Sequence, residues 1–181
     1  LRRELEAGYT FRTKTDTEVL LPAYAKWGEE CLDRLLGMFA FIIWDERDKT
    51  AFIARDRFGV KPFYYHRKAD GTLLAASEIK ALHAAGAEND PNTRTWASYL
   101  AYGTYGRVDE TFFEGVSSLP AGHSMVWKNG AVTTKKWYDL AEAVGSGTDM
   151  GSDVEVEEEY FELLKDTVLL RCRADVPVGL N

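Results

Sequence analysis

Seven consecutive apolar residues, 38–44, constrain the fold of this chain more than any other feature. The run contains β-branched and aromatic residues without polar alternation, so it predicts a strand that is buried on both faces. Shorter strand patterns follow at 50–55, 62–66 and 72–76, and the links between them are too short for helical crossovers. Consecutive strands of this kind pair antiparallel, which predicts a β-meander edged by helices.

Local signals place the other elements and a domain boundary. Residues 8–13 alternate as a short strand would, and a capping box from Thr15 to Glu18 predicts the start of a helix. Asn129-Gly130 predicts a hairpin turn. A small-residue, glycine-containing segment then predicts a linker at 142–154, between a first domain at 1–141 and a second at 155–181. The helix of this second domain has its own capping box, from Ser152 to Glu155.

Charge and composition exclude several classes of function. With 22 Lys and Arg against 29 Asp and Glu, the net charge of −7 argues against nucleic-acid and anionic-membrane partners. Every apolar run is shorter than a membrane span and no basic-apolar leader opens the chain, so we expect a cytoplasmic protein. The 2 cysteines and 3 histidines lack the spacing of a disulfide framework or a metal site.

Two charged segments are candidates for chemistry. Asp16 lies at a predicted helix N-terminus, where it remains ionised and could meet a substrate ammonium group, although most aspartates in such positions only cap the helix. Residues 55–62 are dense in charge between two apolar strands. The favoured interpretation of that stretch is an ordinary turn whose ion pairs fix the crossing of the strands.

Four segments together carry a family resemblance. They are 15–21 (TDTEVLL), 36–41 (LGMFAF), 55–65 (RDRFGVKPFYY) and 76–82 (ASEIKAL). In order and spacing they resemble the class II glutamine amidotransferase domain of glutamine-hydrolysing asparagine synthase, and 119–123 extends the resemblance over most of residues 1–140. Residues 170–179 resemble the helix and strand that lead into the pyrophosphate loop of those enzymes.

The resemblance implies an α+β fold: a four-layer α/β/β/α sandwich of antiparallel sheets, of the N-terminal-nucleophile hydrolase type. We expect this sandwich to be truncated at its N-terminus and followed by the first helix and strand of an α/β synthetase domain. The family hydrolyses glutamine to ammonia and uses ATP and Mg²⁺ to amidate aspartate to asparagine. The partners implied for the parent enzyme are therefore glutamine, aspartate and ATP.

The resemblance also assigns roles to two residues of this sequence. Asp16 matches the aspartate that holds the α-ammonium group of glutamine, and Met38 matches a position that lines the ammonia tunnel, with a buried core methionine as the alternative. The nucleophilic cysteine of the family would precede Leu1 and its nucleotide contacts would follow Asn181. We therefore expect a fragment with no catalytic residue, no metal site and no bound cofactor, inactive by itself.

Other interpretations remain open on the sequence. The parent could be a related class II amidotransferase, a β-lactam-synthetase-like homologue, or a non-catalytic scaffold module of the same fold. Loss of opening strands would also uncover one sheet edge and part of the apolar run at 38–44, so a homodimer through that edge is a further hypothesis.

Overall fold

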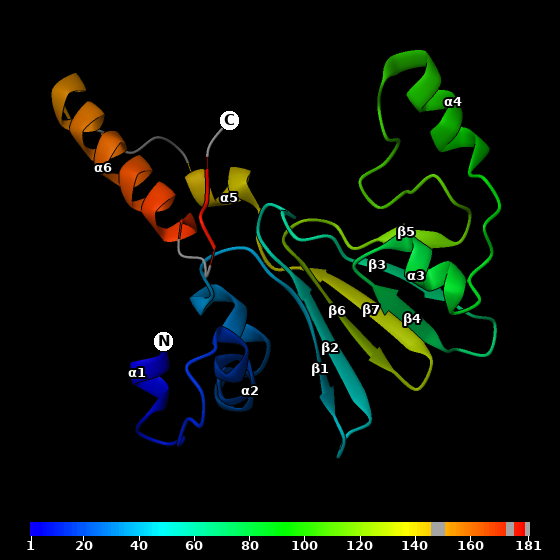
Figure 1. The fold of residues 1–181 in the computed structure, drawn as a ribbon, viewed down its shortest axis with the longest axis horizontal. Helices are drawn as coiled ribbons and strands as arrows, with labels where there is room; N and C mark the ends of the chain where they lie inside the picture. Colours follow the sequence, from blue (N-terminus) through cyan, green and yellow to red (C-terminus); the bar gives the residue numbers. More distant parts are fainter. Residues whose placement is uncertain (146–150, 173–175, 180–181) are drawn as a thin grey trace. The chain divides into compact units, whose positions relative to one another are not determined.

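The computed structural model describes residues 1–145, 151–172 and 176–179. The chain divides into two compact units, Leu1–Asp139 and Leu140–Asn181 (Figure 1). The helices of the first unit are α1 (Arg2–Leu5), α2 (Asp16–Trp27), the 3-10 helix η1 (Gly28–Arg34), α3 (Ile79–Ala84) and α4 (Thr93–Tyr102). Its strands are β1 (Ala40–Asp45), β2 (Thr50–Arg55), β3 (Tyr64–Arg67), β4 (Leu73–Ala76), β5 (Val116–Ser118), β6 (His123–Lys128) and β7 (Ala131–Lys136).

The strands of the first unit form two antiparallel sheets. One sheet has the order β1-β2-β6-β7 and the other has the order β4-β3-β5. The predicted single meander is therefore wrong, because β2 and β3 follow each other in sequence but belong to different sheets. The chain leaves the first sheet after β2, builds the second, and returns to the first through β6 and β7 (Figure 1).

Three apolar clusters show how the layers pack. Val19 and Ala23 of α2 pack with Phe52 of β2, and the rings of Tyr24 and Phe52 stack at 4.8 Å between centroids. A second cluster lies between the sheets; its buried members are Ile53, Phe63, Leu119 and Met125. A third joins α3 to the outer face of the second sheet; its buried members are Leu82, Ala87 and Val116. The first unit is thus an α+β fold with helices outside both antiparallel sheets.

The strand that is buried on both faces is β2 rather than β1. Phe52, Ile53 and Ala54 are at most 1% exposed, because one face of β2 packs on α2 and the other on the second sheet. In β1, by contrast, Ile42 is 49% exposed and Trp44 is 48% exposed. The prediction for 38–44 was wrong on this point because β1 lies at the edge of its sheet.

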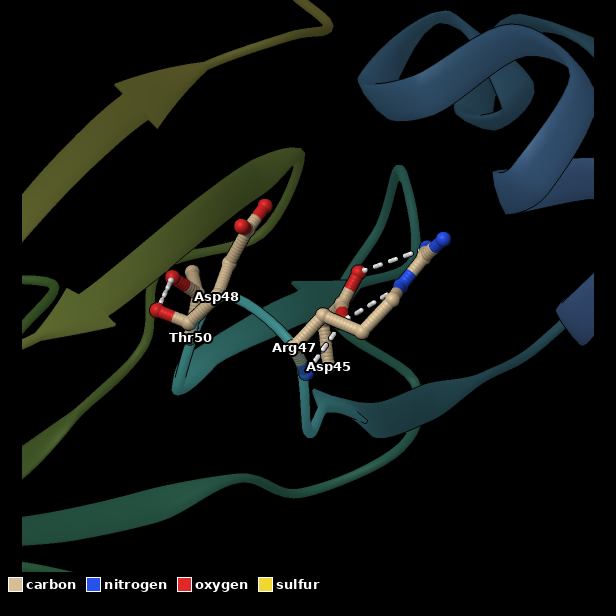
Figure 2. Close-up of polar contacts among 4 residues, drawn as sticks. All are labelled: Asp45, Arg47, Asp48 and Thr50. Carbon is tan, nitrogen blue, oxygen red and sulfur yellow. Dashed lines mark hydrogen bonds and ion pairs between the residues drawn. The ribbon is translucent and has the colours of Figure 1, made fainter.

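The residue types in two of the turns explain how those turns are formed. In the β1–β2 turn (Figure 2), the Asp45 carboxylate accepts hydrogen bonds from the Arg47 backbone N–H at 2.9 Å and from its guanidinium group, while Thr50 Oγ1 donates to the Asp48 carbonyl at 3.1 Å. Between β6 and β7, Asn129 and Gly130 both have positive φ, 50° and 80°. The Asn-Gly pair therefore forms the predicted hairpin.

Asp56 stabilises the link at 56–63, which connects β2 to β3 and so passes from one sheet to the other. Its side chain is buried, at 1% exposure, and accepts hydrogen bonds from three backbone N–H groups of the link and from one in the segment before β1. Oδ1 accepts from Phe58 at 3.1 Å and Val60 at 3.0 Å, and Oδ2 accepts from Lys61 at 3.0 Å and Phe39 at 3.2 Å. A carboxylate can accept all four because each oxygen has two lone pairs.

Arg55 ties the same link to the second sheet. Its guanidinium group donates to the carbonyls of Gly59 and Lys61, both at 2.7 Å, and to Ser118 Oγ at the end of β5, at 3.1 Å. Burial lowers the pKa of Arg55 from its usual value. Because its hydrogen bonds go to carbonyls and a hydroxyl, the segment 55–62 is not held by the ion pairs that the sequence suggested.

Other expected elements differ from the structure. Residues 8–13 form no strand, because they lie in the irregular segment between α1 and α2. In the second unit, α5 (Leu140–Val144) occupies the first part of the predicted linker, and α6 (Asp153–Arg171) begins at the predicted Ser152–Glu155 capping box, which is present.

The predicted strand near the end of the chain falls partly outside the described residues. Its described part, 176–179, is not a strand. No helix in the portion of the chain that the structure describes is long and apolar enough to cross a membrane. The domain limits 1–141, 142–154 and 155–181 stay a prediction.

The Asp56 contacts predict a large loss of stability for Asp56→Asn. An asparagine side chain has only one acceptor oxygen and its amide group faces N–H donors, so buried donors lose their partners. We expect the free energy of unfolding to fall by about 2–5 kcal/mol. Urea unfolding followed by tryptophan fluorescence measures this in the first unit, which contains Trp27, Trp44, Trp96, Trp127 and Trp137.

Asp48→Asn is the matched control for that measurement, because Asp48 lies on the exposed β1–β2 turn and its contact in Figure 2 is made by its backbone carbonyl. It should leave the urea midpoint nearly unchanged. Equal effects of the two substitutions would contradict the role given to the buried carboxylate.

The two cysteines should differ sharply in reactivity. Cys31 is a residue of η1 whose side chain is buried in the core, and burial, with a smaller effect from Asp33, raises the pKa of its thiol to about 11. Cys172 is exposed. Because the thiolate is the reactive form, we expect a disulfide reagent at pH 8 to label only Cys172 in the folded chain and both thiols in urea. Rapid native labelling of Cys31 would contradict this packing.

Candidate functional site

A large open cavity lies in the first unit, at the beginning of α2. Its volume is about 950 Å³. Its wall is formed by the beginning of α2, the segment from the end of η1 to the start of β1, and two residues of the link between β2 and β3. Leu1, Arg2 and Ser77 complete it. Asp16 and Met38, the two residues to which the sequence assigned roles, both line it.

Asp16 is the first residue of α2, and Thr15 is the N-cap. The expected alternative for Asp16, a side chain that only caps the helix, does not describe the structure. Within residues 1–145, 151–172 and 176–179 its carboxylate makes no hydrogen bond or ion pair, and the side chain is exposed at the cavity. Asp16 is therefore an uncommitted carboxylate at the positive end of a helix dipole.

The segment before α2 is fixed by Glu18 and Arg2. Glu18 accepts hydrogen bonds from the backbone N–H groups of Arg12 at 2.8 Å and Thr13 at 2.7 Å, and these bonds lower its pKa. Arg2 donates to the carbonyls of Thr13 at 2.9 Å and Thr15 at 2.7 Å. The capping box predicted from Thr15 to Glu18 is therefore not formed, since Glu18 reaches past Thr15 to the preceding loop.

The wall of the cavity also contains Met38 and Phe39. Met38 is 40% exposed and precedes β1, so it is not the buried core methionine considered as its alternative. Phe39 donates its backbone N–H to the Asp56 carboxylate, as does Lys61, and both Phe39 and Lys61 line the cavity. The carboxylate of Asp56 therefore holds the backbone at two parts of the cavity wall, at Phe39 and at Lys61.

The cationic groups at the cavity are not equivalent. Arg2 is bonded to the loop before α2, and Arg34 pairs with Glu4 at 3.2 Å and lies over the Trp27 ring. Lys61, in contrast, is exposed and has no side-chain partner in the described portion of the chain. The cavity is therefore lined by the carboxylate of Asp16 and the side-chain ammonium group of Lys61, neither of which has a hydrogen-bond or ion-pair partner among the described residues. Charges of both signs suit a zwitterionic ligand such as an amino acid.

Sequence reasoning missed several of these contributions. Asp56 was interpreted as part of an ordinary turn, although an aspartate followed by Gly59 in a polar link is a pattern in which a carboxylate can hold neighbouring backbone N–H groups. Lys61 and Ser77 belong to segments that carry the family resemblance, but no local signal brings them to the wall near Asp16. Among the described residues, no group of three or more His, Cys, Asp and Glu could hold a metal ion.

Comparison with known proteins agrees with this fold and places the chain in a family. Residues 1–138 match the family model described as a glutamine amidotransferase domain. The chain is 35% identical over 180 residues to asparagine synthetase [glutamine-hydrolyzing] 3 of Bacillus subtilis; the match covers 98% of this chain and 28% of that protein. It is 33% identical to amidase chry2 of Gibberella zeae, over 99% of this chain and 26% of the amidase.

A solved structure is similar in fold. Glutamine phosphoribosylpyrophosphate amidotransferase from B. subtilis, complexed with ADP and GMP, gives a TM-score of 0.53 at 23% identity, over 76% of this chain and 26% of the other. The chain thus spans about a quarter of the length of these relatives. Because the family model covers most of the first unit, and asparagine synthetases match along nearly the whole sequence, the chain belongs to the glutamine amidotransferase domain family, in the form found in asparagine synthetases.

Proposed function

We propose that this chain belongs to a glutamine-dependent asparagine synthase and that its cavity binds glutamine. In the parent enzyme, glutamine hydrolysis supplies ammonia, and ATP with Mg²⁺ activates aspartate for amidation to asparagine. The observation that carries the proposal is the uncommitted carboxylate of Asp16 in the cavity, within the segment 15–21 that resembles the family. No residue in the described part of the chain is assigned to ATP or Mg²⁺.

The proposed role of Asp16 is to accept hydrogen bonds from the α-ammonium group of glutamine. Charge-assisted hydrogen bonds between an ammonium group and a carboxylate are stronger than neutral ones. Met38, which lines the same cavity, is proposed to line the path by which ammonia leaves. A thioether suits that role, since it offers ammonia only a weak acceptor and no charge.

A second candidate is a related amidotransferase that forms a different amide. It is favoured by the similarity to a fungal amidase at 33% identity, close to the 35% found for the bacterial asparagine synthetase. Both candidates use the same glutamine-binding cavity and differ in the acceptor, so the tests below apply to either. A scaffold module would instead bind no glutamine.

We further propose that the chain by itself binds glutamine without hydrolysing it. Cys31 lies in the core rather than at the cavity, and its raised pKa of about 11 leaves almost no thiolate at neutral pH. We expect no enzyme-dependent release of glutamate or ammonia from glutamine, as measured by a coupled glutamate assay. Steady turnover that survives in Cys31→Ser and Cys172→Ser variants would show that another nucleophile hydrolyses glutamine, and would contradict this proposal.

Asp16→Asn should weaken glutamine binding with little effect on the fold. Loss of a hydrogen bond to a charged partner costs about 1.5–3 kcal/mol, which corresponds to roughly a 10- to 100-fold increase in Kd. Titration by NMR or calorimetry measures the affinity, and the urea midpoint should fall only slightly, because Asp16 makes no side-chain hydrogen bond or ion pair in the described structure and the substitution removes only its attraction to the helix dipole. Glu30→Gln, which removes an exposed carboxylate outside the cavity, is the matched control.

A ligand without the α-ammonium group separates a specific contact from general electrostatics. 4-Carbamoylbutanoate keeps the amide and the carboxylate of glutamine but lacks the ammonium group. The wild-type chain should prefer glutamine over this analogue, and the Asp16→Asn variant should lose most of that preference. Equal preference in both proteins would contradict the role of Asp16, and absence of glutamine binding in the wild-type chain would contradict the proposed function.

A further inference from the structure

The direction in which the Asp16 side chain points depends on the backbone that precedes it. Asp16 makes no side-chain hydrogen bond or ion pair with the described residues, so no contact of its own carboxylate fixes its position. Thr15, the N-cap residue of α2, makes no side-chain capping bond either. The first turn of α2 is therefore held by bonds from other residues to the segment before it.

Arg2 supplies two of those bonds. Its Nη1 donates to the Thr13 carbonyl at 2.9 Å, and its Nη2 donates to the Thr15 carbonyl at 2.7 Å. The Thr15 carbonyl belongs to the planar peptide group that joins Thr15 to Asp16, so a bond to it fixes the plane from which the Asp16 backbone continues. The guanidinium group is rigid and planar, so its two bonds also hold the two carbonyls in a set geometry.

Arg2 is itself held in place from the core. It belongs to α1, which is anchored by Leu5, a residue that is 3% exposed in the same apolar cluster as Val19 of α2. The Arg2 guanidinium group lies over the Phe11 ring, 4.2 Å from its centroid, and Phe11 packs against that cluster. Arg2 thus connects the core to the peptide group that precedes Asp16.

Glu18 holds a neighbouring part of the same loop. Its bonds go to Arg12 and Thr13, whereas the Arg2 guanidinium group reaches the Thr15 carbonyl. Of these two charged side chains, Arg2 is the one that bonds the peptide group adjacent to Asp16. The loop before α2 therefore has separate contacts for its own shape and for the position of Asp16.

We propose that Arg2 is a positioning residue, which holds the Asp16 carboxylate where it meets the α-ammonium group of glutamine. This inference rests on the proposed function. Arg2 lines the same cavity, and a cation repels an ammonium group, so direct electrostatics from Arg2 would oppose the contact that Asp16 makes. Its favourable contribution to that contact comes through the backbone of Asp16.

Arg2→Met tests the proposal, because methionine keeps an apolar stem beside Phe11 and has no N–H donor. The Kd for glutamine should rise about three- to tenfold, which is less than for Asp16→Asn. The Kd for 4-carbamoylbutanoate should rise less than that for glutamine, since this analogue has no ammonium group for Asp16 to bind. Simple removal of a positive charge would give the opposite order, because the analogue is an anion and glutamine is a zwitterion.

A double-mutant cycle shows whether Arg2 acts through Asp16. In the Asp16→Asn background, Arg2→Met should change the Kd for glutamine by less than about twofold. Arg2→Lys should restore part of the affinity, because an ammonium group can still donate to one of the carbonyls. Arg3→Met is the matched control, since Arg3 is an exposed residue of α1 outside the cavity, and it should change neither Kd. Additive effects of Arg2→Met and Asp16→Asn, or equal weakening of both ligands, would overturn the proposal.

A measurement on the unliganded chain separates this inference from the proposed function. Relaxation of ¹⁵N should show lower order parameters at the amides of Thr15 and Asp16 in Arg2→Met, and no change in Arg3→Met. A wild-type chain that binds no glutamine would overturn the proposed function and the role of Arg2 with it. Glutamine binding by the wild-type chain, together with unchanged order parameters in Arg2→Met, would overturn the role of Arg2 alone.

Discussion

The buried carboxylate of Asp56 is the interaction on which the rest of the first unit depends. It satisfies four backbone N–H groups, on the segment before β1 and on the link after β2. The same link is where the chain passes from one sheet to the other, and Arg55 bonds it to β5. Because Phe39 and Lys61 line the cavity, the carboxylate connects the topology of the fold to the geometry of the proposed glutamine site.

The parts of the fold that could be predicted are those determined by short stretches of sequence. Asn129-Gly130 forms its hairpin because both residues tolerate positive φ, and the Ser152–Glu155 capping box starts α6 because its hydrogen bonds span only three residues. The bounds of β2 likewise follow the local apolar pattern at 50–55. The α+β class and the amidotransferase family also followed from the sequence, the family through ordered motifs.

What could not be predicted depends on contacts between distant segments. The apolar run at 38–44 gives no sign that its strand lies at a sheet edge, and nothing local shows that β2 and β3 separate into different sheets. The candidate site shows the same division. Asp16 and Met38 were found by motif resemblance, whereas Lys61 reaches the same cavity only through the folded link that Asp56 holds.

We propose that glutamine binds in the cavity that Asp16 lines and whose wall the Asp56 carboxylate holds in place. The most direct test is to map the backbone amide shifts of the ¹⁵N-labelled chain as L-glutamine is added. We expect saturable shifts concentrated in the first turn of α2, in the segment at 36–40 and at Lys61, with the second unit unaffected. Saturable shifts confined to other regions, or no shifts at millimolar glutamine, would contradict it.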